Sequence, residues 1–547
     1  MFRFRKHFRE RIWLTLTAVA MLAVAACGGS QGSSKTVDGV ITAWPADLTT
    51  QNPSAMSTPQ GFEFASNVYQ GLVSFKFDRK GNGTYTGQGS DVQPALATRW
   101  DMGETSVTFH LDPEAKFYPT GNPVTADDVK WTLGAILESP NAGNYTANGL
   151  QSENDVIVVD RHTVTIKFKD KEGNGLPVTP TLLAIYGSPA SGIIDSVEAN
   201  RHATSDDPYA TKWLDNNTAG TGPYYVAERE VGQQLVLKAV PGLKVAPAYG
   251  IVTIRIVNGA SIAGLLKGGT INFGEYNLAQ SDINQLGDAG FSVVSEDAPQ
   301  LSYLALASNT GQLQDAKVRQ AIAYAVPYDE IIDSVYFGRA KRALSYVPVT
   351  SSAYTPAWEC YRTDFDHARR LMREAGSPKI SIPLYYNSSE KTQEDIAIHV
   401  ESGLAKIGIE VTLSPRTRSQ MFDVINSRSQ PQPGAPVGMP AIVLFNWGAW
   451  IDDPKIPVGY ATTTGGVNNY SLWSNPEVDS IDKRFALAPA THDRDEAYKR
   501  AQALVAEGVP LVPIVTAQRS MVMVPGMSGA SFPVQQITRF WLLEPTR

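Results

Sequence analysis

The stretch from residue 37 to residue 547 most constrains the fold, because it is long and contains only one cysteine. One hydrophobic core rarely organises so many residues, so we expect two or more domains. The other cysteine, Cys27, lies near the amino terminus, and the two provide no disulfide framework. We expect Cys360 to be a small, buried or half-buried thiol without a chemical role. Packing must therefore stabilise the domains.

The amino-terminal residues have the pattern of an export signal. Residues 1–11 are rich in Arg and Lys, and residues 12–26 are apolar and then small. A membrane-spanning helix needs roughly 20 apolar residues, and this run is shorter and has no basic cluster after it. The pattern predicts a signal peptide over residues 1–26.

The residues that end at Cys27, Val-Ala-Ala-Cys, resemble the lipobox of bacterial lipoproteins. The resemblance implies that Cys27 is lipidated and becomes the new amino terminus after cleavage. The alternative is a plain secretory peptide whose cleavage region contains a cysteine by chance. Residues 27–36 are rich in Gly and Ser, which predicts a flexible tether between the lipid and the folded domains.

The composition is that of an ordinary globular protein, with 43% hydrophobic and 18% charged residues and a net charge of −7. A protein that binds nucleic acid would show a basic stripe on its folded part. The one basic cluster here lies in the predicted signal peptide. We therefore expect no nucleic-acid partner.

Alternating and helical hydrophobic periods occur in mixed order along the chain. Residues 106–111 and 163–168 alternate between apolar and polar, as half-buried strands do. Residues 315–326 and 366–375 carry apolar residues at helical spacing, and Gly376 stops the second helix. This mixture predicts an α/β fold.

Three further segments complete the secondary-structure prediction. Residues 395–407 predict a helix that leads through Gly408 into a strand over residues 409–415. Residues 81–90 and 427–440 are rich in Gly, Pro, Ser and Gln, which favours surface loops. The second loop could also gate a binding cleft.

Motifs for catalysis or metal binding are absent from the sequence. The histidines do not form an H-E-x-x-H pattern, and no Walker-type G-K-[ST] occurs. Residues 259–263 approach the G-x-S-x-G pattern of serine hydrolases but end in Ala263. We therefore favour a binding protein over an enzyme, and expect neither a metal nor a cofactor.

Several segments, in order along the chain, resemble the family 5 extracellular solute-binding proteins of bacterial peptide and nickel ABC importers. Each segment alone is weakly specific, whereas their order and spacing are not expected by chance. In the first segment, Thr125 is placed to cap a helix, with Asp127 and Asp128 in its first turn. The segments are residues 93–136, 218–226, 308–326, 445–454, 468–481 and 501–514.

The resemblance implies a two-lobed periplasmic-binding-protein-like α/β fold with mixed sheets, in which two strands cross between the lobes and a hinge lets them close over a ligand. An extra subdomain belongs to the first lobe. The partners implied are a solute and the permease subunits of an ABC importer, and we expect a monomer. The implied ranges are 37–75, 207–297 and 517–547 for lobe I, 76–206 for the extra subdomain and 298–516 for lobe II.

The cargo implied by the resemblance is a peptide whose main chain pairs with the protein's main chain in the cleft. Asn446 and Trp447 match the strand end that carries much of this contact. The family's peptide binders usually have an Asp three residues after that Trp, which pairs with the peptide's α-amino group; here the position is Trp450. Either Asp452 or Asp453 could replace it, or Asp453 could merely shape the Asp-Pro turn.

Other features leave the cargo open. Trp447 and Trp450 together suit an apolar or aromatic ligand, a sugar face or a cation over a ring, although one of them could instead be a core residue. On the facing lobe, the family's early loop maps to Thr58, Pro59 and Gln60. A metal chelate, haem, an opine or an oligosaccharide are alternative cargoes, and a secreted hydrolase on the same scaffold is an alternative function. A departure at residues 325–328, Ala-Val-Pro-Tyr, leaves a local helix end uncertain.

Overall fold

The structure is a computed structural model, and its residues 37–547 form one compact unit distinct from residues 1–36. It describes residues 38–547 with gaps at 88–91, 258, 260, 277, 389, 418–419, 422, 424–440, 449–452, 467, 490, 534 and 547. The predicted signal peptide, Cys27 and the loop at 427–440 therefore lie outside the described residues.

The described residues form a mixed α/β fold with two lobes, which confirms the predicted fold class. Lobe II is defined here by one large core, whose buried residues all fall between Leu301 and Val515. Lobe I contains three further cores, built mainly from residues before Phe291 together with residues after Val515. The exact domain ranges inferred from the sequence stay a prediction.

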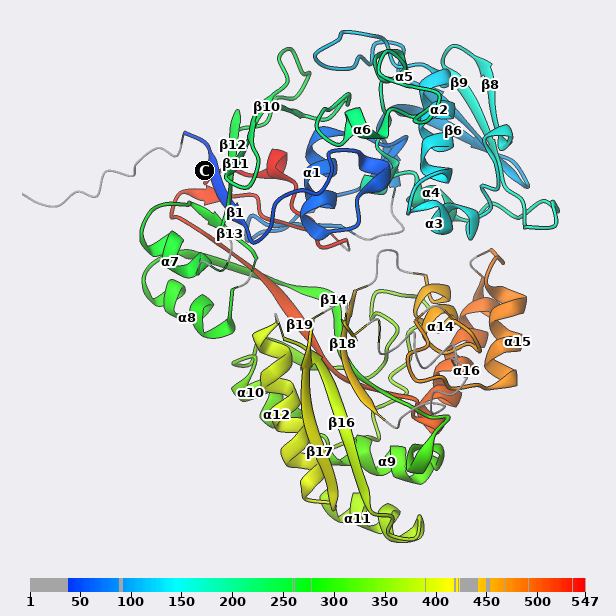
Figure 1. The fold of residues 1–547 in the computed structure, drawn as a ribbon, viewed down its shortest axis with the longest axis vertical. Coiled ribbons are helices and arrows are strands. Elements are labelled where there is room, and N and C mark those ends of the chain that lie inside the picture. The colour runs from blue at the N-terminus through cyan, green and yellow to red at the C-terminus, as the bar shows by residue number, and fades with distance from the viewer. Residues whose placement is uncertain are drawn as a thin grey trace, which may run out of the picture. The chain divides into compact units, whose positions relative to one another are not determined.

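A seven-stranded sheet joins the lobes through two long antiparallel strands, β14 (Ser292–Leu306) and β19 (Leu511–Met523). In Figure 1 the two strands run side by side, one green and one red. Met521 of β19 packs in a lobe I core, whereas Ile514 of the same strand packs in the lobe II core. The sheet order is β13 (Phe273–Gly274), β19, β14, β18 (Ile442–Gly448), β16 (Ile380–Asn387) and β17 (Ile409–Arg416), with β15 (Ala340–Arg342) also on β19.

The helices of lobe II cover this sheet, and α12 (Lys391–Ala405) lies along β16 and β17 in both figures. It begins four residues before the predicted start, because Lys391 pairs with Glu394 and Asp395 at 2.9 Å, in a polar turn without a hydrophobic signal. The others are α9 (Ala316–Ala325), α10 (Tyr328–Ser334), α11 (Phe365–Glu374), α14 (Lys455–Ala461), α15 (Pro476–Phe485) and α16 (His492–Gly508).

Helix α9 resolves the uncertain helix end. Asp315 caps its start by accepting a hydrogen bond from the Lys317 amide. It ends at Ala325, and Val326 is extended because it precedes Pro327, which disfavours the helical conformation for the residue before it. Helix α10 then starts directly at Tyr328.

Lobe I contains two four-stranded sheets. The first has the order β1 (Val40–Trp44), β12 (Ile251–Ile256), β11 (Gln234–Ala239) and β10 (Tyr224–Glu230). The second has the order β6 (Ala97–Met102), β7 (Ser106–Leu111), β9 (Thr163–Lys167) and β8 (Val156–Asp160), and confirms both strands predicted from alternation. The helices of lobe I are α1 (Pro59–Val68), α2 (Ala126–Leu137), α3 (Ala142–Thr146), α4 (Pro180–Ile185), α5 (Ser196–Asn200), α6 (Thr211–Leu214), α7 (Ile262–Lys267) and α8 (Gln280–Asp288).

Two sequence motifs of lobe I have clear structural causes. Thr125 and Asp128 form a capping box at the start of α2, as the predicted cap requires. Gly222, in the turn before β10, lies against the backbone of α1: a Cβ there would be 2.3 Å from the Val68 carbonyl carbon. Only glycine allows this approach, in which the Gly222 amide donates to the Val68 oxygen at 2.9 Å.

Two predictions are wrong. Residues 81–90 are not wholly loop, because β4 (Tyr85–Gly87) pairs with β3 (Asp78–Arg79) and β21 (Ser531–Pro533). The partner β21 is so distant in sequence that local composition cannot show the pairing.

Cys360 is exposed rather than buried or half-buried. It ends a turn in which the large Trp358 side chain fills the core, and the two residues after that anchor, Glu359 and Cys360, are exposed before Tyr361 returns to the core. The remaining short pairs are β2 (Val73–Phe75) with β5 (Val92–Pro94) and β20 (Met527–Ser528) with β22 (Glu544–Pro545).

Candidate ligand-binding site

Strand β18 places the two neighbouring residues Asn446 and Trp447, whose side chains point to opposite faces of the sheet because strand side chains alternate. The Asn446 amide is held within lobe II. Its oxygen accepts a hydrogen bond from Ser302 at 2.8 Å, and its nitrogen donates to Glu390 at 2.7 Å. Asn446 therefore fixes the strand from the face opposite Trp447.

Trp447 lines an open cavity of about 330 Å³ to which both lobes contribute residues. Part of its indole packs against the lobe II core, and the rest forms cavity wall. Core packing is thus shown for this side chain, and its contact with a ligand stays a prediction. The other lining residues are Phe75, Asn141, Asn144, Tyr145, Asn148, Ala184, Ile185, Ser188, Ala190, Ile456, Tyr460, Asn468 and Gln535.

The lobe I wall is built around the short helix α3. Asn141 precedes the helix, and its side-chain nitrogen donates to the carbonyl oxygens of Ser54 and Met56 at 2.7 and 2.9 Å. Tyr145 lies within α3, with its hydroxyl hydrogen-bonded to Ser191. Burial raises the pKa of Tyr145, so this wall carries no ionised phenol near neutral pH. These bonds hold the wall in place before any ligand arrives.

The lobe II wall comes from helix α14, which contributes Ile456 and Tyr460. Asp453 just before the helix accepts a hydrogen bond from the Lys455 amide at 2.9 Å. Its carboxylate also lies 2.7 Å from the Arg494 guanidinium, and both side chains are buried. These contacts fit the simpler interpretation, in which Asp453 shapes the Asp-Pro turn.

Two more ionisable groups lie in the same buried cluster. Burial lowers the pKa of Lys455, although Asp453 and Asp482 oppose the change. Burial also raises the pKa of Asp482, against a hydrogen bond that Tyr498 donates at 3.0 Å. Two acids and two bases therefore balance one another beneath α14, rather than in the cavity.

The other predicted site residues do not reach this cavity or fall outside the described residues. Thr58 caps α1 by accepting a hydrogen bond from the Gly61 amide at 3.1 Å. Pro59 and Gln60 form the first turn of that helix, and none of the three lines the cavity. Trp450 and Asp452 lie outside the described residues, so their roles stay predictions.

Sequence reasoning missed most of the lobe I wall. Asn141, Asn144 and Asn148 are spaced at three and four residues, which places amide side chains on one face of a helical turn, and this signal was available. Gln535 is different, because it follows β21 and reaches the cavity only through the pairing of β21 with β4. No local pattern marks it.

Comparison with known proteins places this geometry in a family. Residues 91–469 match the sequence model of the bacterial extracellular solute-binding proteins, family 5 Middle. This match covers more than half of the chain. The chain belongs to the family 5 bacterial extracellular solute-binding proteins.

Individual members of family 5 show the same relationship along most of the chain. The probable D,D-dipeptide-binding periplasmic protein DdpA of Escherichia coli K12 is 26% identical over 477 residues, which cover 85% of this chain and 86% of that protein. Heme-binding protein A of Haemophilus influenzae is 24% identical, with 91% and 93% covered. The substrate-binding protein CtaP of Listeria monocytogenes superposes with a TM-score of 0.77 at 23% identity, covering 93% of this chain and all of CtaP.

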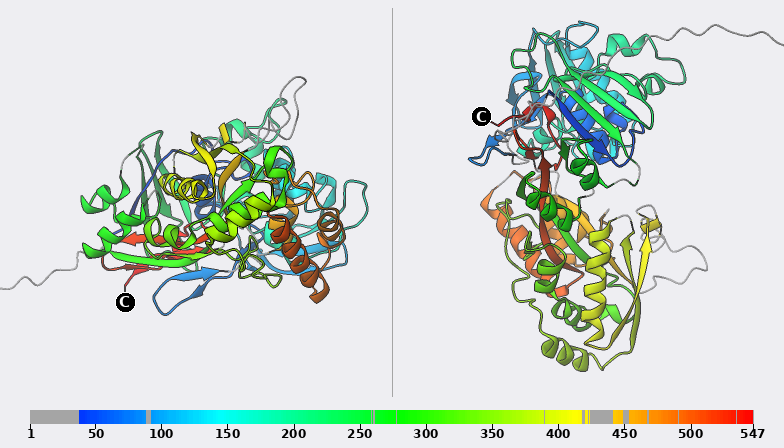
Figure 2. Two further views of the ribbon diagram at one scale, coloured as in Figure 1. Left: turned by 90° about the horizontal axis from the view of Figure 1, so that it is seen from below. Right: turned by 90° about the vertical axis from the view of Figure 1, so that its left-hand side faces the viewer.

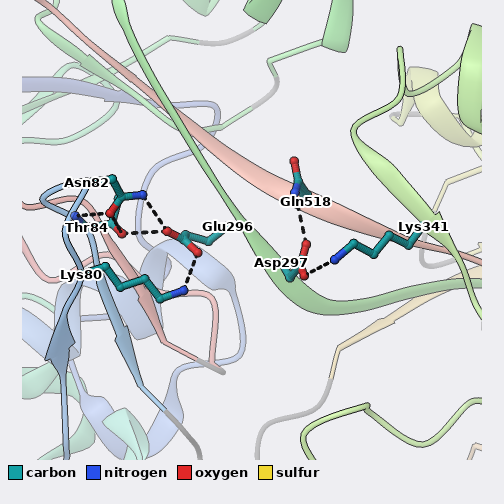
Figure 3. Close-up of polar contacts among 7 residues, drawn as sticks. All are labelled: Lys80, Asn82, Thr84, Glu296, Asp297, Lys341 and Gln518. Atoms are coloured by element: carbon teal, nitrogen blue, oxygen red, sulfur yellow. Dashed lines mark hydrogen bonds and ion pairs between the residues drawn. The ribbon is translucent and has the colours of Figure 1, made fainter.

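In this family 5 protein the crossing strand β14 carries two polar contacts immediately before an irregularity in its pairing with β19. The β14–β19 register shifts between Asp297 and Gln300. Just before the shift, Glu296 accepts hydrogen bonds from the β3–β4 turn: from Lys80 at 2.7 Å, Asn82 at 3.0 Å and Thr84 at 2.8 Å (Figure 3). Burial would raise the pKa of Glu296, but these donors outweigh it and lower the pKa.

The next residue, Asp297, is hydrogen-bonded to β15 and β19 instead of to the β3–β4 turn. Lys341 of β15 donates to it at 2.6 Å and the Gln518 amide of β19 donates at 3.1 Å, as Figure 3 shows. The hydrogen bond from Lys341 is the main reason that the pKa of Asp297 is lowered. Two adjacent carboxylates on one crossing strand are thus fixed to different elements, at the point where the ladder is interrupted.

A buried carboxyl pair lies in lobe I beside the crossing. Glu63 accepts hydrogen bonds from the Trp44 indole and the Tyr276 hydroxyl, both at 2.8 Å, while Glu275 is paired with Arg519 of β19. Burial raises the pKa of Glu63 well above its ordinary value, and the charge of Glu275 adds to the effect. The environment of Glu63 therefore disfavours its ionised form.

No helix in the described part of the chain has both the length and the apolar character needed to cross a bilayer. No group of three or more His, Cys, Asp or Glu side chains in the same residues is arranged to hold a metal ion.

Proposed function

We propose that this solute-binding protein captures a peptide in the cavity between its lobes and delivers it to the permease of an ABC importer. The observation that carries the proposal is the cavity wall itself, which combines aromatic rings from both lobes with carboxamide groups from both lobes. Rings accommodate varied side chains, and amides match the donors and acceptors of a peptide main chain. The description of DdpA as a probable dipeptide-binding protein supports a peptide cargo.

We further propose that the protein acts as a monomer tethered by a lipid on Cys27 to the outer face of the cytoplasmic membrane, near its permease. A chain with Cys27→Ser should then be exported without incorporating radiolabelled fatty acid. Lipid incorporation that persists in this variant would contradict the proposal. Binding without catalysis is also proposed, and steady cleavage of a peptide by the purified protein would contradict it.

Native purification followed by mass spectrometry of the co-purifying molecules tests the cargo. A peptide mixture is the expected result, since a wall of rings and amides does not select one sequence. Trp447→Ala should reduce the affinity for the recovered peptides by at least about tenfold, because an aromatic anchor in a desolvated cavity is worth roughly 2 kcal/mol or more. Trp473→Ala is the matched control, as Trp473 packs against the same core without lining the cavity.

A haem or another macrocycle is the alternative cargo, supported by the likeness to heme-binding protein A of Haemophilus influenzae. A coloured product with absorbance near 400 nm, and no peptide in the mass spectrum, would replace the peptide proposal with this one. Non-peptide metal chelates, opines and oligosaccharides would be recognised by their masses in the same experiment.

A further inference from the structure

The cavity wall carries no formal charge on any described residue. Its polar side chains are carboxamides and hydroxyls, and the carboxamides come from both lobes. A carboxamide offers both donors and an acceptor but no formal charge, so it satisfies a neutral amide without neutralising an ammonium or a carboxylate. The five carboxamide residues are Asn141, Asn144, Asn148, Asn468 and Gln535.

Gln535 is the most informative of these residues. Its side-chain oxygen and nitrogen are both buried, and neither has a hydrogen-bond partner among the described residues. Buried amide groups nearly always have partners, so an unpartnered amide beside a cavity indicates a missing partner. A rotation about its terminal side-chain bonds would bring one amide atom to a ligand in the cavity, where a peptide group supplies the complementary donor or acceptor.

The charged groups beneath α14 are already paired or balanced within the protein. Asp453 is paired with Arg494 at 2.7 Å, and Lys455 and Asp482 complete a balanced cluster beneath α14. None of these four groups lines the cavity. An ammonium or carboxylate brought into the cavity would lose its hydration and meet no opposite charge on the described wall, which is strongly unfavourable.

We infer that the part of the ligand held in this cavity is uncharged and rich in amides, so that the protein selects the interior of a peptide, or a peptide with blocked ends, over free termini. This inference rests on the proposed peptide-binding function and adds its chemical class.

An equimolar mixture of two random tetrapeptide libraries tests the inference. One library has free ends, and the other is N-acetylated and C-amidated. The purified protein is loaded, washed and analysed by mass spectrometry. Blocked peptides should be retained at least about tenfold more than free peptides. Preferential retention of free peptides, abolished by Asp452→Asn, would overturn the inference and leave peptide binding intact. Retention of neither library would overturn peptide binding as well.

Two variants of cavity residues, with one control variant outside the cavity, test whether this preference arises in the cavity. Gln535→Leu keeps the size of the side chain and removes its amide, so it should weaken the binding of blocked peptides several-fold. Gln312→Leu, at an exposed position outside the cavity, should leave binding unchanged. Asn144→Asp puts a carboxylate into the wall and should shift the preference towards peptides with a free amine. An unaltered preference in Asn144→Asp, with the thermal stability retained, would show that this cavity does not read the ligand's charge.

Discussion

The carboxylate of Asp453 lies 2.7 Å from the guanidinium of Arg494, and both side chains are nearly excluded from solvent. This pair connects the start of α14, which forms the lobe II wall of the cavity, to the first turn of α16. This buried ion pair therefore supports the lobe II wall. Because Asp453 is already paired with Arg494, we do not expect it to bind the amine of a ligand.

Asp453→Ala should lower the free energy of unfolding by about 3–5 kcal/mol, because it leaves Arg494 buried without its counter-ion. Asp493→Ala, at an exposed position beside Arg494, should change it by less than about 1 kcal/mol. Urea denaturation followed by circular dichroism measures both. A fully stable Asp453→Ala protein that has lost peptide binding would instead favour the ligand-binding role.

Gly222→Ala should destabilise lobe I by about 1–3 kcal/mol, because the new methyl group would be forced into the backbone of α1. Gly250 provides the matched control: a Cβ there would meet nothing within 4 Å, and the backbone conformation is one that alanine adopts. Thermal unfolding of the two variants should differ clearly. Equal melting temperatures would contradict the close approach of this turn to Val68.

Glu296→Gln should lower stability by about 1 kcal/mol, since hydrogen bonds to a charged group are worth 1.5–3 kcal/mol but Lys80 is half exposed and screened. The lowered pKa of Glu296 means that its contribution is present above the ordinary carboxyl pKa and is lost as the pH falls through the folded value. The difference between the two proteins should therefore shrink in acid and in high salt. Glu114→Gln, in an exposed turn, serves as the control.

Glu63 should give the free energy of unfolding a pH dependence opposite in sign to that from Glu296. Its pKa is raised in the folded protein, so the protonated form contributes stability below the ordinary pKa of 4.5, and this contribution is lost as the pH rises through the folded value. The groups that face it are Glu275, Tyr276, Arg519 and Arg539.

Glu63→Gln keeps a neutral group that can donate to Glu275, so the unfolding free energy of this variant should fall less than that of the natural protein between pH 5 and pH 8. Urea titrations at three pH values measure the difference. Glu172→Gln, which alters an exposed acid, should preserve the natural slope. Parallel slopes for Glu63→Gln and the natural protein would show that Glu63 is ionised in the fold.

Local patterns predicted the parts of the fold that local physics determines. The strand over residues 106–111 and the capping box at Thr125 both follow from a few neighbouring residues, and both occur as predicted. The β4–β21 pair and the position of Gln535 depend on contacts between distant parts of the chain, which no periodicity records. For the site, Trp447 was predicted from resemblance, whereas the amide wall around Asn144 was visible in the sequence but not recognised.

The pairing between β4 and β21 also bears on how this chain acquires its structure as it leaves the translocation machinery. Lobe II takes all its buried core residues from one continuous stretch, so it can fold as soon as that stretch has emerged. The lobe I core that contains α1 cannot, because Asn67 of α1 bonds to Thr538 and Phe540, and Tyr85 pairs with Ser531. The part of the chain that emerges first must wait for residues made more than 400 positions later. Until those residues arrive, the apolar side chains of that core remain unburied, and unburied apolar surface favours aggregation during folding.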